Sequence, residues 1–567
     1  MRFITAAVLF VISALLILTG IADRTIWMPS PLHIERISIS TKAPLVVVKN
    51  SVLQQFPDAP TFTVSGDSGV WVASGRQSDI NAWVGNTPHL ELSAVTTANE
   101  THVFKQNFRG SQLSADPRGS DLWTNEWIGN RVASATVVNP TDQGLIIATD
   151  GFAPPPAELK LTWANPFDPT PSRNLFIFGG VLLLAATVLN FWAWYTMRRD
   201  RGPRRRTPKA PQGPRTRRRR LSNNAPVRGR RSVRNFTAIV AGGLVLASLT
   251  GCARPASPSA SPTPSASSNQ VANPVLTEGQ LRVVIDRIAA SVATADEQKD
   301  SKLLTQRVAG PALLARTAYY NLEKASKKIS APVPIATKLI KVALPEANNQ
   351  WPRTAMAITS NGDVDSLPQM LVIQQDSPRE QYHLWYYIDM LPGVRFPLVT
   401  SAAVGATPVA KDSLFLKVAP NALVTAFGNL IDNGPLSPQA DNFNTLNDEY
   451  YNQIYQSQQN QKKALKNATV TVTHALGSDN IVSLATVNSG ALVAVYMNDQ
   501  YVIKPKKATQ AVAVAGNEKI LLGSAGSTSG IRSTYGSMLL FYVPAGGSKD
   551  KIQTLGATQV LLSVRGL

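Results

Sequence analysis

Two long apolar stretches without charged residues limit how this chain can fold. One runs from Phe3 to Ala22, directly after Arg2, and the other runs from Leu175 to Met197. Each is long enough to cross a hydrocarbon layer of about 30 Å as a helix. The second ends in tryptophan and tyrosine residues followed by arginines, the pattern of a helix end at a membrane surface. We therefore predict a membrane protein. A cleavable signal peptide is the alternative for residues 1–22, but no small-x-small cleavage site follows, so we favour an uncleaved anchor.

A third apolar run lies within residues 235–252 and follows a group of arginines. It is short for a permanent span, and its length suits the apolar core of a signal sequence. Its last four residues are Leu249, Thr250, Gly251 and Cys252. They match the lipobox of bacterial lipoproteins, in which a small residue precedes a cysteine that becomes lipidated. We predict lipidation at Cys252, with a third transmembrane helix as the alternative.

Cys252 is the single cysteine of the chain, which excludes an intrachain disulfide and any cysteine-based metal site. A lipobox this far from the N-terminus has three explanations. The chain is a fusion that is cut after export into two pieces, or it stays intact with 236–251 as a third span. The third explanation is that translation starts internally, at Met197.

The basic charge of the chain is concentrated in one segment. Between Arg198 and Arg234 there are sixteen Lys and Arg residues and one acid, Asp200, which gives +15 of the net charge of +20. Because basic loops stay in the cytoplasm, we expect this segment inside and residues 23–174 and 253–567 outside. Its expected partners are anionic lipid head groups. Nucleic-acid binding is not expected, because the loop lacks interleaved aromatic residues and the remainder is nearly neutral.

The segment 23–174 has the pattern of a mostly β domain. Short β-branched or alternating runs are separated by Gly, Ser, Asn and Pro clusters, and one short helix is expected around Ser78–Val84. The expected strands include Ile34–Ser40, Phe62–Val64, Val70–Val72 and Leu145–Ala148. We expect a small β-sandwich.

The C-terminal half has an α+β pattern that occurs twice. A helix capped at Thr277 carries Leu281, Val284, Ile285, Ile288 and Val292 on one face. A second helix is expected over 311–328, followed by strands at 340–343, 354–359, 370–375 and 382–388. Helices at 419–430 and 448–463 then precede strands at 469–473, 481–487, 491–497, 501–504, 538–543 and 560–564.

Helices before an antiparallel sheet resemble the NTF2-like, or cystatin-like, α+β fold. With the lipobox and the Pro/Ser-rich stretch after it, the chain resembles a group of uncharacterised envelope proteins and lipoproteins of high-GC Gram-positive bacteria, the Actinobacteria. The resemblance implies two tandem NTF2-like modules outside the cell membrane. It implies a location and a fold, and no activity.

These features divide the chain into eight segments. They are a transmembrane helix or signal anchor (1–22), an extracellular β-rich domain (23–174), a transmembrane helix (175–197), an Arg-rich cytoplasmic loop (198–234), the lipobox-type signal or third transmembrane helix (235–252), a Pro/Ser-rich tether (253–276) and two NTF2-like modules (277–400 and 401–567).

Sequence fragments that resemble catalytic motifs lack the rest of their motifs. The fragments are the protease-like Gly66–Gly69, the S-x-x-K match at 548–551, the SDN match at 478–480 and the D-x-D match at 363–365. The five histidines are scattered and form no metal-binding pair. We therefore predict no catalytic, metal or cofactor site.

One aromatic run has the character of a ligand site. Residues 382–387 read Tyr-His-Leu-Trp-Tyr-Tyr, and His383, Trp385 and Tyr387 are candidates for lining a pocket in an NTF2-like module. The alternative is ordinary core packing of large aromatic side chains.

The leading hypothesis is a non-catalytic envelope protein that presents binding or scaffold domains to other envelope components. The first alternative is an envelope enzyme that acts on lipid or cell-wall intermediates. A buried titratable cluster in a cavity favours this alternative. The second alternative is a substrate-binding lipoprotein.

Overall fold

The computed structural model describes most of the chain outside the Arg-rich and Pro/Ser-rich segments. The described residues are 2–96, 101–138, 142–165, 169–199, 274–326, 329, 331–362, 366–507 and 509–567. They fall into two compact units, one made of Met1–Pro29 with Phe167–Gln270 and one of Ser30–Pro166 with Val271–Leu567.

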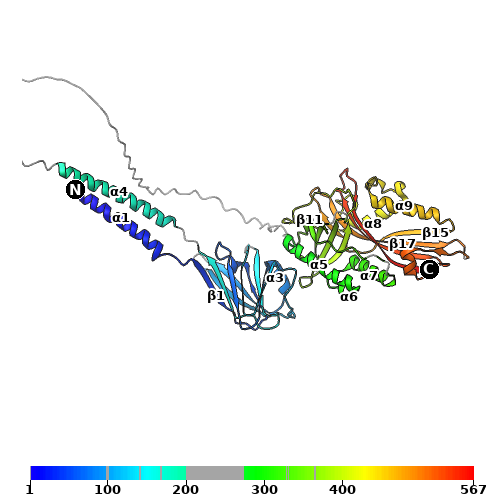
Figure 1. The fold of residues 1–567 in the computed structure, drawn as a ribbon, viewed down its shortest axis with the longest axis horizontal. Coiled ribbons are helices and arrows are strands. Elements are labelled where there is room, and N and C mark those ends of the chain that lie inside the picture. Colours follow the sequence, from blue (N-terminus) through cyan, green and yellow to red (C-terminus); the bar gives the residue numbers. More distant parts are fainter. Residues whose placement is uncertain are drawn as a thin grey trace, which may run out of the picture. The chain divides into compact units, whose positions relative to one another are not determined.

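The first unit is a helical hairpin of α1 (Arg2–Thr25) and α4 (Thr170–Arg199), which pack side by side in opposite directions (Figure 1). Small residues allow the close approach: Ser13 Oγ donates to the Gly179 carbonyl at 2.7 Å. A Cβ on Gly179 would lie 2.7 Å from Ile17. Both helices are long and apolar enough to cross a membrane. Their predicted positions are confirmed.

The second unit begins with a β-sandwich, drawn in blue to cyan in Figure 1. One sheet has the order β1-β10-β3-β8 and the other has the order β6-β5-β2-β9-β4-β7. Inward side chains such as Phe62, Val72 and Trp163 fill the space between them. The strands are β1 Leu32–Ser38, β2 Leu45–Val48, β3 Thr61–Ser65, β4 Val70–Arg76, β5 His89–Thr96, β6 Thr101–Phe108, β7 Asn125–Gly129, β8 Val132–Thr136, β9 Gln143–Ala148 and β10 Glu158–Ala164, with helices α2 Asn50–Leu53 and α3 Gln77–Val84.

The outer face of the six-stranded sheet carries a second core. Helix α3 and the loop before β7 pack there through Trp71, Trp83 and Trp123. The ring centroids of Trp71 and Trp123 are 6.0 Å apart. This packing holds the loop 113–124 in place.

The C-terminal part starts with helices and continues with a four-stranded antiparallel sheet in the order β11-β12-β13-β14. Helix α5 begins with the predicted cap, a capping box between Thr277 and Gln280. The elements are α5 Glu278–Gln298, α6 Ser301–Leu304, α7 Gly310–Ala325, β11 Lys338–Pro345, β12 Arg353–Ser360, β13 Gln369–Gln375 and β14 His383–Asp389.

The second half repeats this order, with helices before an antiparallel sheet β15-β17-β20-β21 to which β16 adds. The predicted strands at 491–497 and 501–504 are one long strand, because β20 pairs with it from Ala491 to Ile503 and β15 pairs with it from Met497 to Pro505. The elements are η1 Pro420–Ala422, α8 Leu423–Asn433, η2 Gly434–Leu436, η3 Ala440–Asn442, α9 Glu449–Ala464, β15 Ala468–Leu476, β16 Val482–Ala485, β17 Ala491–Pro505, β18 Val512–Ala513, α10 Gly516–Leu522, β19 Gly526–Ser527, β20 Ile531–Val543 and β21 Gln553–Gly566.

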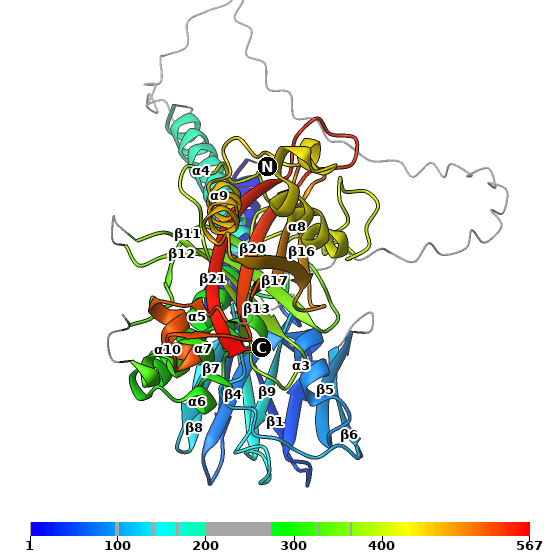
Figure 2. The ribbon, with the colours of Figure 1, turned by 90° about the vertical axis from the view of Figure 1, so that its right-hand side faces the viewer.

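The two α+β halves share one core. Along β17, Val493 and Val495 face α8 and α9, which lie beside this sheet in Figure 2. Leu492 and Ala494 alternate with them and join the core of the first half. The second sheet therefore lies between its own helices and the first half, and residues 274–567 form one α+β structure.

Candidate functional site

A cavity of about 500 Å³ lies where the two α+β halves meet. Its polar side chains come from α7, β13, β14, α10 and β21: they are Arg316, Tyr319, Gln369, Tyr387, Asp389, Asn517 and Thr558. The segment after α7 supplies an apolar wall that includes Ile329, Pro332 and Val333. The cavity thus has one polar and one apolar side.

Arg316 is the cation of this cavity and is 1% exposed. Its Nη1 donates to Asp296 Oδ2 at 3.0 Å, and its Nη2 donates to the Val333 carbonyl at 2.6 Å. Its guanidinium carbon lies 5.2 Å from the ring centroid of Tyr387, within range of a cation–π contact. Its Nε is buried and has no hydrogen-bond partner among the described residues.

Asp389 stands at the C-terminal end of β14. Gln369 Nε2 donates to its Oδ1 at 3.3 Å, and Thr558 Oγ1 donates to its Oδ2 at 3.1 Å. Burial raises the pKa of Asp389, while these two hydrogen bonds and the charge of Arg316 act in the opposite direction. A carboxyl group with a raised pKa can exchange a proton more readily near neutral pH.

Tyr319 of α7, which carries a hydroxyl group, also lines this cavity. This hydroxyl is buried and, in the part of the chain that the structure describes, meets no hydrogen-bond partner. Burial raises the pKa of Tyr319, so the hydroxyl stays neutral and can both donate and accept. The next residue, Tyr320, instead donates to Asp296 Oδ1 at 2.6 Å and completes the support of Arg316.

The family comparison covers this part of the chain. A family model described as a domain of unknown function (DUF8094) matches residues 272–564, more than half of the sequence. The chain belongs to this family. The match runs through both α+β halves, in agreement with their common core. No curated protein and no solved structure matches the chain.

Of the three predicted pocket residues in the DUF8094 domain, Tyr387 lines this cavity, and His383 and Trp385 do not. The pairing of β13 with β14 shifts between Val372 and Ile373, so no residue of β13 pairs with Trp385 of β14. This bulge breaks the alternation on which the prediction depended.

Trp385 and His383 occupy other surroundings. Trp385 packs against Gly310 at the start of α7, where an added Cβ would lie 2.6 Å from its ring. His383 is half-buried, and burial together with the charge of Arg307 lowers its pKa. Trp385 thus packs where α7 meets the sheet, and neither side chain lines the cavity with Tyr387.

The sequence analysis missed Arg316, although its pattern carried a signal. Arg316 follows Ala312 by four residues and precedes Tyr320 by four, so it lies on the buried face of α7. A charged residue on an apolar helix face needs a partner or a function. Gln369 and Thr558 reach the cavity only through the pairing of their strands, which the local sequence does not reveal.

A second buried polar cluster lies between α8, α9 and the second sheet. His474 Nδ1 lies 2.6 Å from Asp499 Oδ1, and His474 Nε2 lies 3.6 Å from Asp432 Oδ1. Ser537 Oγ donates to Asp499 Oδ2 at 2.8 Å. A nucleophilic triad needs the serine to face the imidazole, and here it binds the aspartate, so this network is structural.

The other sequence motifs that lie within the described residues carry no site. The Gly66–Gly69 fragment connects β3 and β4, and the hydroxyls of Ser478 and Ser548 accept backbone N–H groups of their own loops. Among the described residues no group of three or more metal-ligating side chains occurs. The lipobox at Cys252, the Arg-rich segment 200–234 and the 363–365 fragment lie outside the described residues.

Proposed function

We propose that this protein is anchored in the cell membrane and presents a ligand-binding DUF8094 domain outside the cytoplasm. The observation that carries the proposal is a pair of buried polar atoms without a partner among the described residues, Arg316 Nε and the Tyr319 hydroxyl, on side chains that line the cavity. Leaving a buried donor unpaired costs about 1–3 kcal/mol. A ligand that supplies the missing partners recovers this free energy on binding.

The ligand we propose is uncharged, carries hydroxyl groups and has an apolar part. Asp296 pairs with the positive charge of Arg316, and burial raises the pKa of Asp389 and so disfavours its charged form; a net charge on the ligand would therefore find no free counter-charge. A hydroxyl group can accept from Arg316 Nε and donate to Asp389. The ring of Tyr387 and the apolar wall suit a sugar face or an acyl chain.

Two arguments support the location. Helices α1 and α4 have the length and composition of membrane spans, and the basic segment 198–234 after α4 favours a cytoplasmic position for that end. Residues 23–174 are then extracytoplasmic, and the basic loop contacts anionic lipid. Lipidation of Cys252 would add a further anchor for residues 253–567.

Helices before an antiparallel sheet in both halves support a relation to the NTF2-like folds. We also propose membership among actinobacterial envelope proteins and lipoproteins, on the basis of the lipobox and the Pro/Ser-rich stretch of the sequence. In an NTF2-like domain, one face of the sheet lines a cavity.

An envelope enzyme is the second candidate function, and Asp389 favours it. Burial raises the pKa of this carboxyl group, which makes it a candidate general acid or base for a ligand in the cavity. Neither histidine nor cysteine is among the side chains that line the cavity. Proton transfer at a bound ligand is therefore the chemistry to test first.

The binding proposal is tested with probes that share one tail and differ in the head group. The full-length protein in lipid nanodiscs is titrated, below micelle-forming concentrations, with octyl glucoside, octyl sulfate and octyl trimethylammonium, and binding is followed by saturation-transfer NMR. We expect only the glucoside to bind with saturation. Tyr319→Phe should weaken it about tenfold, because one hydrogen bond is lost.

Tyr455→Phe on α9 is the matched control, because this helix packs on the other face of the second sheet. It should leave the affinity unchanged. Equal binding of all three probes, or equal affinity of the wild type and Tyr319→Phe, would contradict the proposal.

A further inference from the structure

We infer that the β-sandwich, residues 30–166, is the docking partner of the DUF8094 domain and stays bound to it without the connecting segment 167–270. Both lie in the same compact unit. Three separate contacts join them: two are built around buried arginine and aspartate side chains, and the third around the half-buried Arg379. This inference is independent of the ligand proposed for the cavity.

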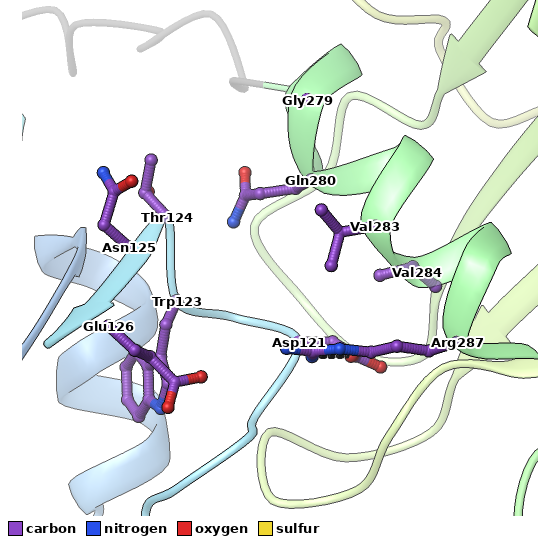
Figure 3. A pocket seen from close by; sticks show the side chains of 10 residues that line it. All are labelled: Asp121, Trp123, Thr124, Asn125, Glu126, Gly279, Gln280, Val283, Val284 and Arg287. Carbon is purple, nitrogen blue, oxygen red and sulfur yellow. Dashed lines mark hydrogen bonds and ion pairs between the residues drawn. The ribbon is translucent and has the colours of Figure 1, made fainter. Parts of the chain in front are cut away.

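The first contact surrounds Asp121, from the loop before β7. Its side chain is completely buried between two arginines of the DUF8094 domain: Arg287 Nη1 lies 2.9 Å from Oδ1, and Arg307 Nη1 lies 2.5 Å from Oδ2. The backbone N–H of Tyr382 also donates to Oδ2 at 2.9 Å. Figure 3 shows Asp121 reaching toward Arg287 of α5. One domain thus supplies the anion and the other supplies its cations.

The second contact has the opposite polarity. Arg353 at the start of β12 is fully buried, with its Nη1 2.8 Å from Asp79 Oδ1 of helix α3. Its guanidinium lies 3.6 Å above the ring of Trp351, which packs against the tryptophan core of the sandwich. Arg76 of the sandwich also donates to the carbonyl of Pro274 at 2.7 Å.

The third contact is made by Arg379, in the loop between β13 and β14. It donates to the backbone carbonyls of Trp83 at 2.9 Å and Leu113 at 2.8 Å, and to the hydroxyl of Thr87. Its guanidinium lies 5.0 Å from the ring centroid of Trp83. The donors of one side chain therefore bind the end of α3 and two loops of the sandwich.

These contacts have the properties of an interface between two proteins. Exposed ion pairs contribute little, but Asp121, Asp79 and Arg353 are desolvated, and removing one partner of such a pair is costly. Charges of alternating sign also fix the orientation of the two domains. Between Trp123 and Gln280 a small pocket of about 140 Å³ remains (Figure 3), as is common at interfaces that admit water.

The docking has a consequence for the connection. Both domains must lie on the same side of the membrane, so the chain between α4 and α5 must return across it, after which it either stays intact or is cut. If it is cut at Cys252, the three contacts hold the two products together. The same interface therefore joins the two domains whether the chain is cut at the lipobox or stays intact.

The test separates the two parts without altering either of them. A specific protease site is inserted after Ser268 of the full-length protein, the purified protein is cut, and dissociation of the tagged C-terminal product is followed on a biosensor surface. We expect the two products to remain bound. Asp121→Asn and, on the other partner, Arg379→Ala should each speed dissociation about tenfold or more.

The matched control is Asp116→Ala, in the same loop as Asp121. Asp116 pairs with Arg118 at 2.6 Å on the surface and makes no ion pair with the DUF8094 domain among the described residues. It should dissociate like the wild type. Immediate separation of the wild-type products, or equal rates for all variants, would overturn the inference.

Discussion

His474 is buried beside two carboxylate groups, those of Asp432 and Asp499. Burial alone lowers its pKa, but hydrogen bonds and charges of Asp432 on α8 and Asp499 on β17 outweigh this and raise the pKa to about 9. The Nε2 atom of Gln458 on α9 lies 3.2 Å from Nε2 of the same ring. The imidazole is therefore held as a cation between two carboxylates.

This arrangement predicts a stability that depends on pH. A histidine whose pKa rises on folding contributes its full stabilisation below the unfolded pKa of about 6.5, and loses it as the pH rises through about 9. We expect the denaturant concentration at the midpoint of unfolding to decrease as the pH is raised from 6.5 to 9.5. In His474→Gln this fall should be much smaller. Parallel curves for both proteins, from chemical denaturation at several pH values, would contradict the assignment.

The residues of the candidate site could be predicted from the sequence only in part. Tyr387 was identified because aromatic residues in a strand line cavities or cores. His383 and Trp385 were grouped with it by alternation, which the bulge at Trp385 breaks. Arg316 stood on the buried face of a predicted helix, but Asp296 and Asp389 reach it from other elements, and only the fold shows this.

At the scale of elements, the start of helix α7 determines how this helix meets the sheet. Gly310 has a φ of +54°, and a Cβ there would lie 2.6 Å from the ring of Trp385. Strain and overlap act together at this position, so Gly310→Ala should lower the free energy of unfolding by about 2 kcal/mol or more.

Gly279→Ala on α5 is the matched control, because an added Cβ there meets nothing within 4 Å and φ is not positive. It should be neutral or slightly stabilising, since alanine favours helices. Denaturant titration of both variants decides between the outcomes. Equal stability of the two would show that Gly310 is not required at this contact.

The elements themselves were the most predictable level. The cap at Thr277 and the apolar face from Leu281 to Val292 predicted α5, and apolar length predicted α1 and α4. Strand β17 was predicted as two strands, at 491–497 and 501–504, with the polar residues Asn498, Asp499 and Gln500 between them. Pairing with β15 and β20 on both sides overrides that local preference.

At the scale of the whole molecule, pairing between distant segments decides the architecture. The sequence pattern predicted two modules, but alternate residues of β17 face different cores, so the two halves form one structure. The contacts of Asp121, Arg353 and Arg379 likewise join segments separated by the connection 167–270. No local pattern predicts such contacts, because each partner alone resembles an ordinary surface charge.

The central claim is that the β-sandwich and the DUF8094 domain form one body outside the cytoplasm. Cysteines introduced one at a time into a Cys252→Ala background test it in intact cells with a membrane-impermeant maleimide, with that background protein as the control. Ser68→Cys and Thr528→Cys lie on exposed loops of the two domains, and Ser222→Cys lies in the Arg-rich segment. We predict labelling of the first two in intact cells and of Ser222→Cys only after lysis. Labelling of Ser68→Cys with protection of Thr528→Cys would place the domains on opposite sides and contradict the account.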